Sequence, residues 1–83
     1  MTRITLYTRP GCHLCDVAVA ALEEIGEPFE EVDITTDAAL EIEYGERIPV
    51  IMLDGKEHGY WRVEKQRLLR DIGRAAPRGR ETA

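Results

Sequence analysis

Two hydrophobic periods divide the first third of the chain into a strand and a helix. Residues 4–8, Ile-Thr-Leu-Tyr-Thr, alternate and are rich in β-formers, which predicts a strand. From Asp16 to Ile25 the chain is alanine-rich, and its apolar residues recur at helical spacing. The apolar surface expected to be buried comprises Leu14, Ala18, Leu22 and Ile25, widened by Val17, Val19, Ala20 and Ala21. Gly26 and Pro28 predict the end of this helix, because glycine favours a helix C-cap and proline blocks continuation.

A second strand and a short helix are expected next. Residues 29–34 alternate with one slip, which predicts a strand. Since a whole helix connects it to the first strand, the two should form a parallel pair through a right-handed crossover. Residues 35–37, Thr-Thr-Asp, can cap a helix, so a short helix is predicted over residues 37–44, ending at Gly45. Its inward-facing residues are expected to be Leu40 and Tyr44.

The most hydrophobic run, residues 48–53, predicts a central strand. Pro49 near its start is informative, because proline in a central strand removes a hydrogen-bond donor from the ladder. Asp54 and Gly55 form a dipeptide that favours a hairpin turn. Residues 56–60 are therefore predicted to return as an antiparallel edge strand.

The predicted order of elements is β-α-β-α-β-β-α, which indicates an α/β fold in a single domain. The closing helix is expected over residues 62–75, with Leu68, Leu69 and Ile72 facing inward. The domain should span residues 1–76, and residues 77–83 are predicted to be a disordered tail. A domain of this size buries only ~60% of its unfolded surface, so its core is modest.

The charges, which sum to −5 at pH 7, are unevenly distributed along the chain. Residues 23–46 contain ten acidic residues and neither lysine nor arginine, whereas residues 47–83 contain nine basic and five acidic residues. The acidic block is either a solvated exterior, which is the commoner use of a charge run, or a face for a basic partner. The basic segment is not interleaved with aromatic residues, so nucleic-acid binding is not expected.

No basic-then-apolar leader is present, and no apolar run approaches the ~18 residues of a membrane span. The sequence thus predicts a soluble cytoplasmic protein without membrane binding. In a reducing compartment the two cysteines, Cys12 and Cys15, are more often catalytic or metal-binding than structural. A structural disulfide across so short a loop would gain only ~2 kcal/mol. A zinc site needs about four ligands, and the chain adds only His13 and His58 to the pair.

The predicted strand-to-helix junction gives the cysteine pair a chemical use. Backbone N–H groups at a helix N-terminus lack partners and carry partial positive charge, so a cysteine there ionises more easily. Cys15 follows Cys12 by one turn on the same face, close enough for a disulfide. A redox pair and a metal half-site both remain open at this point.

Taken together, these motifs resemble the glutaredoxin-like branch of the thioredoxin fold. The resemblance extends over nearly the whole chain and rests on residues 8–15 (TRPGCHLC), 47–50 (RIPV) and 54–59 (DGKEHG). It implies a four-stranded mixed sheet flanked by three helices. It also implies a cis peptide bond before Pro49, which would lie against the cysteine pair, and a backbone at Ile48 that pairs with an incoming substrate chain.

The resemblance implies a dithiol–disulfide oxidoreductase. Cys12 would be the nucleophile that attacks a substrate disulfide, and Cys15 would resolve the mixed disulfide. His13 either stabilises the Cys12 thiolate as an imidazolium or is a solvent-facing helix residue. Arg9 matches the position where glutaredoxins carry a basic residue beside the thiolate, where it would aid ionisation or hold a glutathione carboxylate.

Several residues depart from the glutaredoxin pattern. The pair between the cysteines is His-Leu rather than Pro-Tyr, and His58 and Gly59 replace a Gly-Gly pair. Trp61 and Arg62 stand where the family carries acids that hold the γ-glutamyl end of glutathione, and an arginine cannot accept hydrogen bonds from an ammonium group. Gly59 and Trp61 are substrate-binding candidates; Trp61 either lines a groove for a protein partner or anchors packing.

Glutathione and a thioredoxin-reductase-type flavoprotein both remain open as the electron donor. The expected partners are disulfide-containing proteins or small thiol substrates, and the protein is expected to be a monomer without a tightly bound cofactor or metal. The alternative is a non-catalytic thioredoxin-fold module that binds a partner at the Ile48–Pro49 groove. In that alternative it could carry a [2Fe–2S] cluster, as some glutaredoxins do between two subunits, although a cluster is not expected here.

Overall fold

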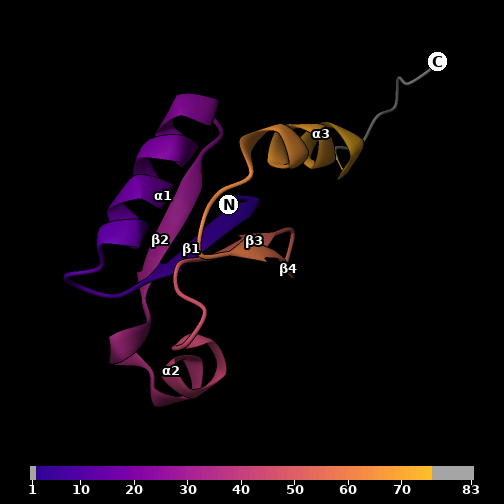
Figure 1. Ribbon diagram of the computed structural model, residues 1–83. Coiled ribbons are helices and arrows are strands. Elements are labelled where there is room, and N and C mark those ends of the chain that lie inside the picture. Colours follow the sequence, from indigo (N-terminus) through magenta and orange to yellow (C-terminus); the bar gives the residue numbers. More distant parts are fainter. Residues whose placement is uncertain (1, 76–83) are drawn as a thin grey trace.

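A computed structural model describes residues 2–75 of the chain (Figure 1). Its elements are β1 (Ile4–Thr8), α1 (His13–Ile25), β2 (Phe29–Asp33), the 3₁₀ turn η1 (Ile34–Thr36), α2 (Ala38–Tyr44), β3 (Val50–Leu53), β4 (Lys56–Tyr60) and α3 (Lys65–Ala75). The predicted order of strands and helices is confirmed, with one 3₁₀ turn added. The tail predicted over residues 77–83 and the domain end at residue 76 lie outside the described residues.

The four strands form one mixed sheet in the order β2-β1-β3-β4. β1 pairs in parallel with β2, from Ile4 opposite Phe29 to Thr8 opposite Asp33, as the crossover predicted. β1 is antiparallel to β3, and β3 is antiparallel to β4, with an irregularity in register after Ile51. The hairpin and its edge strand β4 are therefore confirmed, and β1 lies inside the sheet.

The core lies on one face of this sheet. In β1 the buried residues alternate, with Ile4, Leu6 and Thr8 pointing to that face. The core cluster joins residues of β1, α1, β3 and α3, namely Ile4, Leu6, Ala18, Leu22, Ile51, Leu53 and Leu68. Helices α1 and α3 thus pack against the same face of the sheet.

Helix α2 is held on the other side of β1, and Figure 1 shows it apart from α1 and α3. Tyr7 alternates with the buried residues of β1 and stacks on Tyr44 of α2, with ring centroids 4.7 Å apart. The Asp37 side chain accepts hydrogen bonds from the N–H groups of Ala39 and Leu40, so the predicted cap is confirmed. Leu40 and Tyr44 are only half-buried, because this short helix covers little of the sheet.

Four predictions of inward-facing residues were wrong. Leu14 and Val17 of α1 are each 49% exposed, Ala20 of α1 is also exposed, and Leu69 of α3 is 51% exposed. The buried stripe of α1 consists of Cys15, Ala18 and Leu22. In a helix with apolar residues at most positions, spacing alone cannot choose the face, and the sheet selects the stripe that begins with Cys15.

Several element boundaries also differ from the predictions. Helix α1 begins at His13, three residues before the predicted start, because Cys12 caps it. β2 ends at Asp33, and Ile34 is buried in the 3₁₀ turn instead. β3 begins at Val50, directly after the buried Pro49, which cannot donate to the ladder. Helix α3 begins at Lys65 rather than at residue 62. Among the described helices, none is long and apolar enough to cross a membrane.

Candidate redox site

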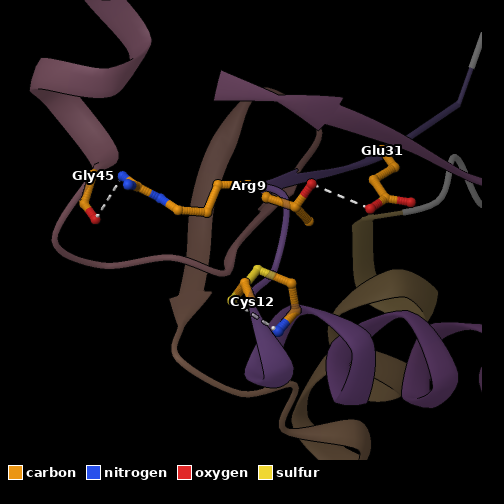
Figure 2. The surroundings of a disulfide bond; sticks show 6 residues. Arg9, Cys12, Glu31 and Gly45 are labelled. Atoms are coloured by element: carbon orange, nitrogen blue, oxygen red, sulfur yellow. Dashed lines mark hydrogen bonds between the residues drawn. A yellow bond between two sulfur atoms is a disulfide. The ribbon is translucent and has the colours of Figure 1, made fainter. Parts of the chain in front are cut away.

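The cysteine pair lies where β1 passes into α1 (Figure 2). Gly11, in the loop between them, has a φ of 76°, a left-handed conformation that glycine adopts at little cost. The loop then brings Cys12 to the N-cap of α1 in an extended conformation. The predicted strand-to-helix junction is therefore confirmed.

The two sulfur atoms are bonded, and the Cα atoms of Cys12 and Cys15 lie 5.2 Å apart, within the usual range for disulfides. The N–H of Cys15 donates a hydrogen bond to Cys12 Sγ over 3.1 Å. Cys12 therefore occupies the position of a capping side chain that accepts from the third helical residue. When the pair is reduced, this donor and the helix N-terminus would favour the charged form of Cys12.

The two cysteines differ strongly in access. Cys12 is half-buried, whereas Cys15 is only 2% exposed. The exposed side chains of Leu14 and Val17 project from the same end of α1 and add apolar surface near Cys12. A molecule that approaches the pair from solvent therefore reaches Cys12 first, next to an apolar surface.

Arg9 does not point toward the cysteines. Figure 2 shows its side chain directed away from the disulfide, toward the end of α2. One guanidinium nitrogen donates to the carbonyl oxygen of Gly45 over 3.5 Å, and it lies 3.8 Å from the Glu41 carboxylate. In this oxidised state Arg9 ties the loop to α2, so the expected proximity of a positive charge to the Cys12 sulfur is not observed.

The other expected site residues lie at the start of α1 and in the loop before β3. His13 is the first residue of α1 and is exposed, next to the Cys12 cap. Ile48 is half-buried, Pro49 is buried, and the peptide bond between them is cis. The carbonyl oxygen of Pro49 accepts a hydrogen bond from the Trp61 N–H over 2.8 Å, which joins the loop before β3 to the residue after β4.

Trp61 is 54% exposed and therefore does not serve as a buried packing anchor. Its φ of 72° is unusual for a bulky residue, and its indole N–H donates to the carbonyl oxygen of Glu46 over 3.3 Å. The Tyr60 ring meets the indole edge-on, with centroids 5.0 Å apart. Gly59 pairs with Ile51 in the edge strand β4, and with Trp61 and Arg62 it lines a hollow of about 500 Å³.

A small acidic hollow beside Cys15 was not expected from the sequence. The buried Thr8 hydroxyl donates to the Glu31 carboxylate over 3.1 Å, a contact drawn in Figure 2. The hollow has a volume of about 210 Å³ and is lined by Thr8, Arg9, Pro10, Gly11, Cys15, Asp16, Glu31 and Asp33. Parallel pairing of β1 and β2 creates it, because the carboxyl ends of both strands meet next to the start of α1.

A polar contact between β4 and α3 was likewise not expected from the sequence. His58 Nε2 lies 2.8 Å from the Asp71 carboxylate, and the Arg67 guanidinium donates to the His58 carbonyl oxygen. The hydrogen bond from His58 lowers the pKa of Asp71. His58 is thus engaged by residues of α3, and it does not line the hollow beside Cys15. Across residues 2–75 no group of three or more His, Cys, Asp or Glu side chains is arranged to hold a metal ion.

Comparison with known proteins decides the family. Residues 3–73 match the family described as glutaredoxin-like domain (DUF836). The chain belongs to this glutaredoxin-like family. A relative from Mycobacterium tuberculosis, the uncharacterised protein Rv0508, is 38% identical over 82 residues, which cover 88% of this chain and 84% of the relative.

Solved structures agree with the glutaredoxin-like assignment. The protein XcR50 from X. campestris has a TM-score of 0.72 at 46% identity, and the match covers 89% of this chain and 99% of that one. NrdH-redoxin from Escherichia coli, which is described as a glutaredoxin-like protein with a thioredoxin-like activity profile, has a TM-score of 0.61 at 26% identity. That match covers 90% of this chain and 96% of the other. The glutaredoxin-like fold and a cysteine pair at disulfide distance together support a redox function.

Proposed function

We propose that this glutaredoxin-like domain is a dithiol–disulfide oxidoreductase that reduces disulfides of proteins or small molecules. The observation that carries the proposal is the asymmetry of the pair: Cys12 is half-buried at the cap of α1, and Cys15 is 2% exposed. A nucleophile needs access and a stabilised thiolate, whereas a resolving thiol needs only to reach the first sulfur.

The reaction proceeds in two exchanges. The Cys12 thiolate attacks one sulfur of the substrate disulfide, forms a mixed disulfide and releases the other substrate sulfur as a thiolate, which takes up a proton. The Cys15 thiolate then attacks Cys12 Sγ, forms the Cys12–Cys15 disulfide and releases the second substrate thiol. Two electrons pass from the protein to the substrate, and an external donor returns them.

We propose that the donor is a flavoprotein of the thioredoxin-reductase type rather than glutathione. Trp61 and Arg62 occupy the place where glutaredoxins hold the γ-glutamyl end of glutathione with acids, and both are exposed. The thioredoxin-like activity profile stated for the NrdH-redoxin relative supports the same choice. Turnover of a model disulfide with NADPH and such a reductase should exceed turnover with glutathione and glutathione reductase.

Two serine variants test the assigned roles. Cys15→Ser should accumulate a mixed disulfide between Cys12 and a disulfide substrate, because the resolving thiol is missing. Cys12→Ser should accumulate none, because the remaining thiol of Cys15 is buried. Mass spectrometry of the non-reduced proteins measures both.

The two variants are matched controls for each other, since each retains one thiol and loses one sulfur atom. Equal trapping by both variants, or trapping by Cys12→Ser alone, would contradict the assigned roles. A wild-type protein that turns over no disulfide with either donor, although its Cys12–Cys15 disulfide forms, would argue for the non-catalytic partner-binding alternative.

A further inference from the structure

A groove next to the redox site combines apolar and acidic side chains. It has a volume of about 620 Å³ and lies between α2 with its following loop and the end of β4. Its lining residues are Glu41, Ile42, Glu43, Glu46, Arg47, Tyr60 and Trp61. The groove thus brings part of the acidic block together with the aromatic pair that follows β4.

Three large apolar side chains of the groove are open to solvent. Ile42 is 87% exposed, Tyr60 46% and Trp61 54%. None of them belongs to the core cluster on the opposite side of the sheet. Such a patch, rimmed by polar residues, is typical of an interaction site.

The charge of the groove is negative after its own ion pairs are counted. Arg47 lies 3.2 Å from Glu57 and 4.0 Å from Glu43, and the Arg9 guanidinium lies 3.8 Å from Glu41. Within residues 2–75 no ion pair engages the Glu46 carboxylate. The groove itself is lined by three carboxylates and one guanidinium group, which gives it a net charge of −2.

Two contacts join the groove to the redox site. The Trp61 N–H donates to the carbonyl oxygen of Pro49 over 2.8 Å, in the loop that leads into β3. Arg9, three residues before Cys12, donates to the carbonyl oxygen of Gly45 at the end of α2. A chain whose disulfide meets Cys12 would therefore have its neighbouring residues near the groove.

We propose that this groove docks the residues flanking the disulfide of a protein substrate, and that it selects flanks containing lysine or arginine next to a bulky apolar residue. The basic side chains would neutralise the Glu43 and Glu46 carboxylates and lie against the aromatic pair, and the apolar residue would cover Ile42. This inference rests on the proposed oxidoreductase function and specifies its substrate class.

Peptide substrates test the preference directly. Two peptides that share one intramolecular disulfide carry either Lys-Leu or Glu-Leu flanks, and bis(2-hydroxyethyl) disulfide serves as a neutral small substrate. The ratio of kcat/KM for the lysine peptide to that for the glutamate peptide should be about three to ten at low salt. It should fall toward one as the ionic strength rises, because exposed charges are screened.

A matched pair of double variants locates the preference. Glu43→Gln with Glu46→Gln removes two charges from the groove, and Glu23→Gln with Glu30→Gln removes two exposed charges elsewhere. The first should abolish most of the lysine preference, and the second should retain it. Equal ratios in wild type and the groove variant, or equal losses in both variants, would overturn the proposal.

A binding measurement separates this inference from the redox chemistry. Trp61 is the only tryptophan of the chain, so its fluorescence reports on the groove. Peptides with serine in place of the disulfide cysteines cannot react, yet the lysine version should change the emission at lower concentration than the glutamate version. Failure to reduce even the neutral disulfide would contradict the oxidoreductase function. Equal affinities of the two serine peptides would contradict the proposed docking role of the groove.

Discussion

Replacing Cys15 with proline isolates the hydrogen bond that the Cys12 sulfur accepts. The Cys15 N–H donates to Cys12 Sγ over 3.1 Å, and an ionised Cys12 would hold the same bond more strongly. Proline has no N–H and is tolerated in the first turn of a helix. Cys15→Ala is the reference variant, because both substitutions remove the resolving thiol and only proline also removes the donor.

The expected size follows from this one contact. Hydrogen bonds to charged groups contribute about 1.5–3 kcal/mol, and each 1.4 kcal/mol corresponds to roughly a factor of ten. The acid dissociation constant of Cys12 should therefore be about ten- to a hundredfold smaller in Cys15→Pro than in Cys15→Ala. Proline should therefore raise the pKa of Cys12 relative to alanine, while the favourable effect of the helix N-terminus should be retained in both variants.

The pH dependence of alkylation by iodoacetamide measures this difference, because the thiolate is the reacting species and each variant has a single cysteine. Circular dichroism and thermal melting check that α1 persists, since proline also restricts the residue before it. Leu14→Pro combined with Cys15→Ala is the matched control. It places the same ring one residue earlier and retains the N–H at position 15.

Two results would refute this reasoning. The first is the same pH profile for Cys15→Ala and Cys15→Pro in folded proteins. The second is an equal shift in the Leu14→Pro control, which would assign the effect to a disturbed first turn rather than to the hydrogen bond from position 15.

Two further predictions concern stability. Hydrogen bonding to Arg3 lowers the pKa of Asp54, so the contribution of Asp54 to the free energy of unfolding is present above its unfolded-state pKa and disappears as the pH falls through its folded-state pKa. Asp54→Asn, which tolerates the φ of 54°, should therefore lower the free energy of unfolding at neutral pH and weaken its decrease toward acid pH. Urea unfolding at a series of pH values measures this, and an unchanged decrease toward acid pH would contradict it. Alanine should have opposite effects on stability at two glycines where an added Cβ would meet no atom within 4 Å. Gly26→Ala should lower the free energy of unfolding by about 1–2 kcal/mol because of its φ of 86°, whereas Gly73→Ala inside α3 should raise it by about 0.5–1 kcal/mol. Denaturant unfolding that shows a change of the same sign for both variants would contradict this prediction.

Local signals in the sequence were sufficient for most of the fold. The alternation of residues 4–8, the Asp54-Gly55 turn and the glycine after residue 25 each determine an element through its own backbone preferences. The buried face of α1 was harder to predict from the sequence. Leu14 and Cys15 are adjacent and both apolar, and contact with the sheet determines which of them is buried. Sequence therefore identified the helix but not its inner face.

For the site, as for the fold, the sequence predicted the local features but not the contacts between distant residues. The position of the cysteine pair at the strand-to-helix junction follows from adjacent residues, so the sequence located the pair but not the cap that Cys12 forms. The partners of Arg9 and His58 are 36 and 13 residues away, and nothing near either residue indicates which carbonyl or carboxylate it meets. The groove forms only where α2 lies close to the end of β4, so neither segment by itself could indicate it.

The position of β1 inside the sheet has a consequence for folding. One edge of β1 pairs with β2, which follows about 25 residues later in the chain. The other edge can pair only after β3 has formed, because Ile4 lies opposite Leu53. Until that distant segment is available, β1 presents a bare apolar edge, which is a template for pairing with another chain. The slow step in folding should therefore be the docking of the β3–β4 hairpin, and chains shortened before residue 50 should aggregate.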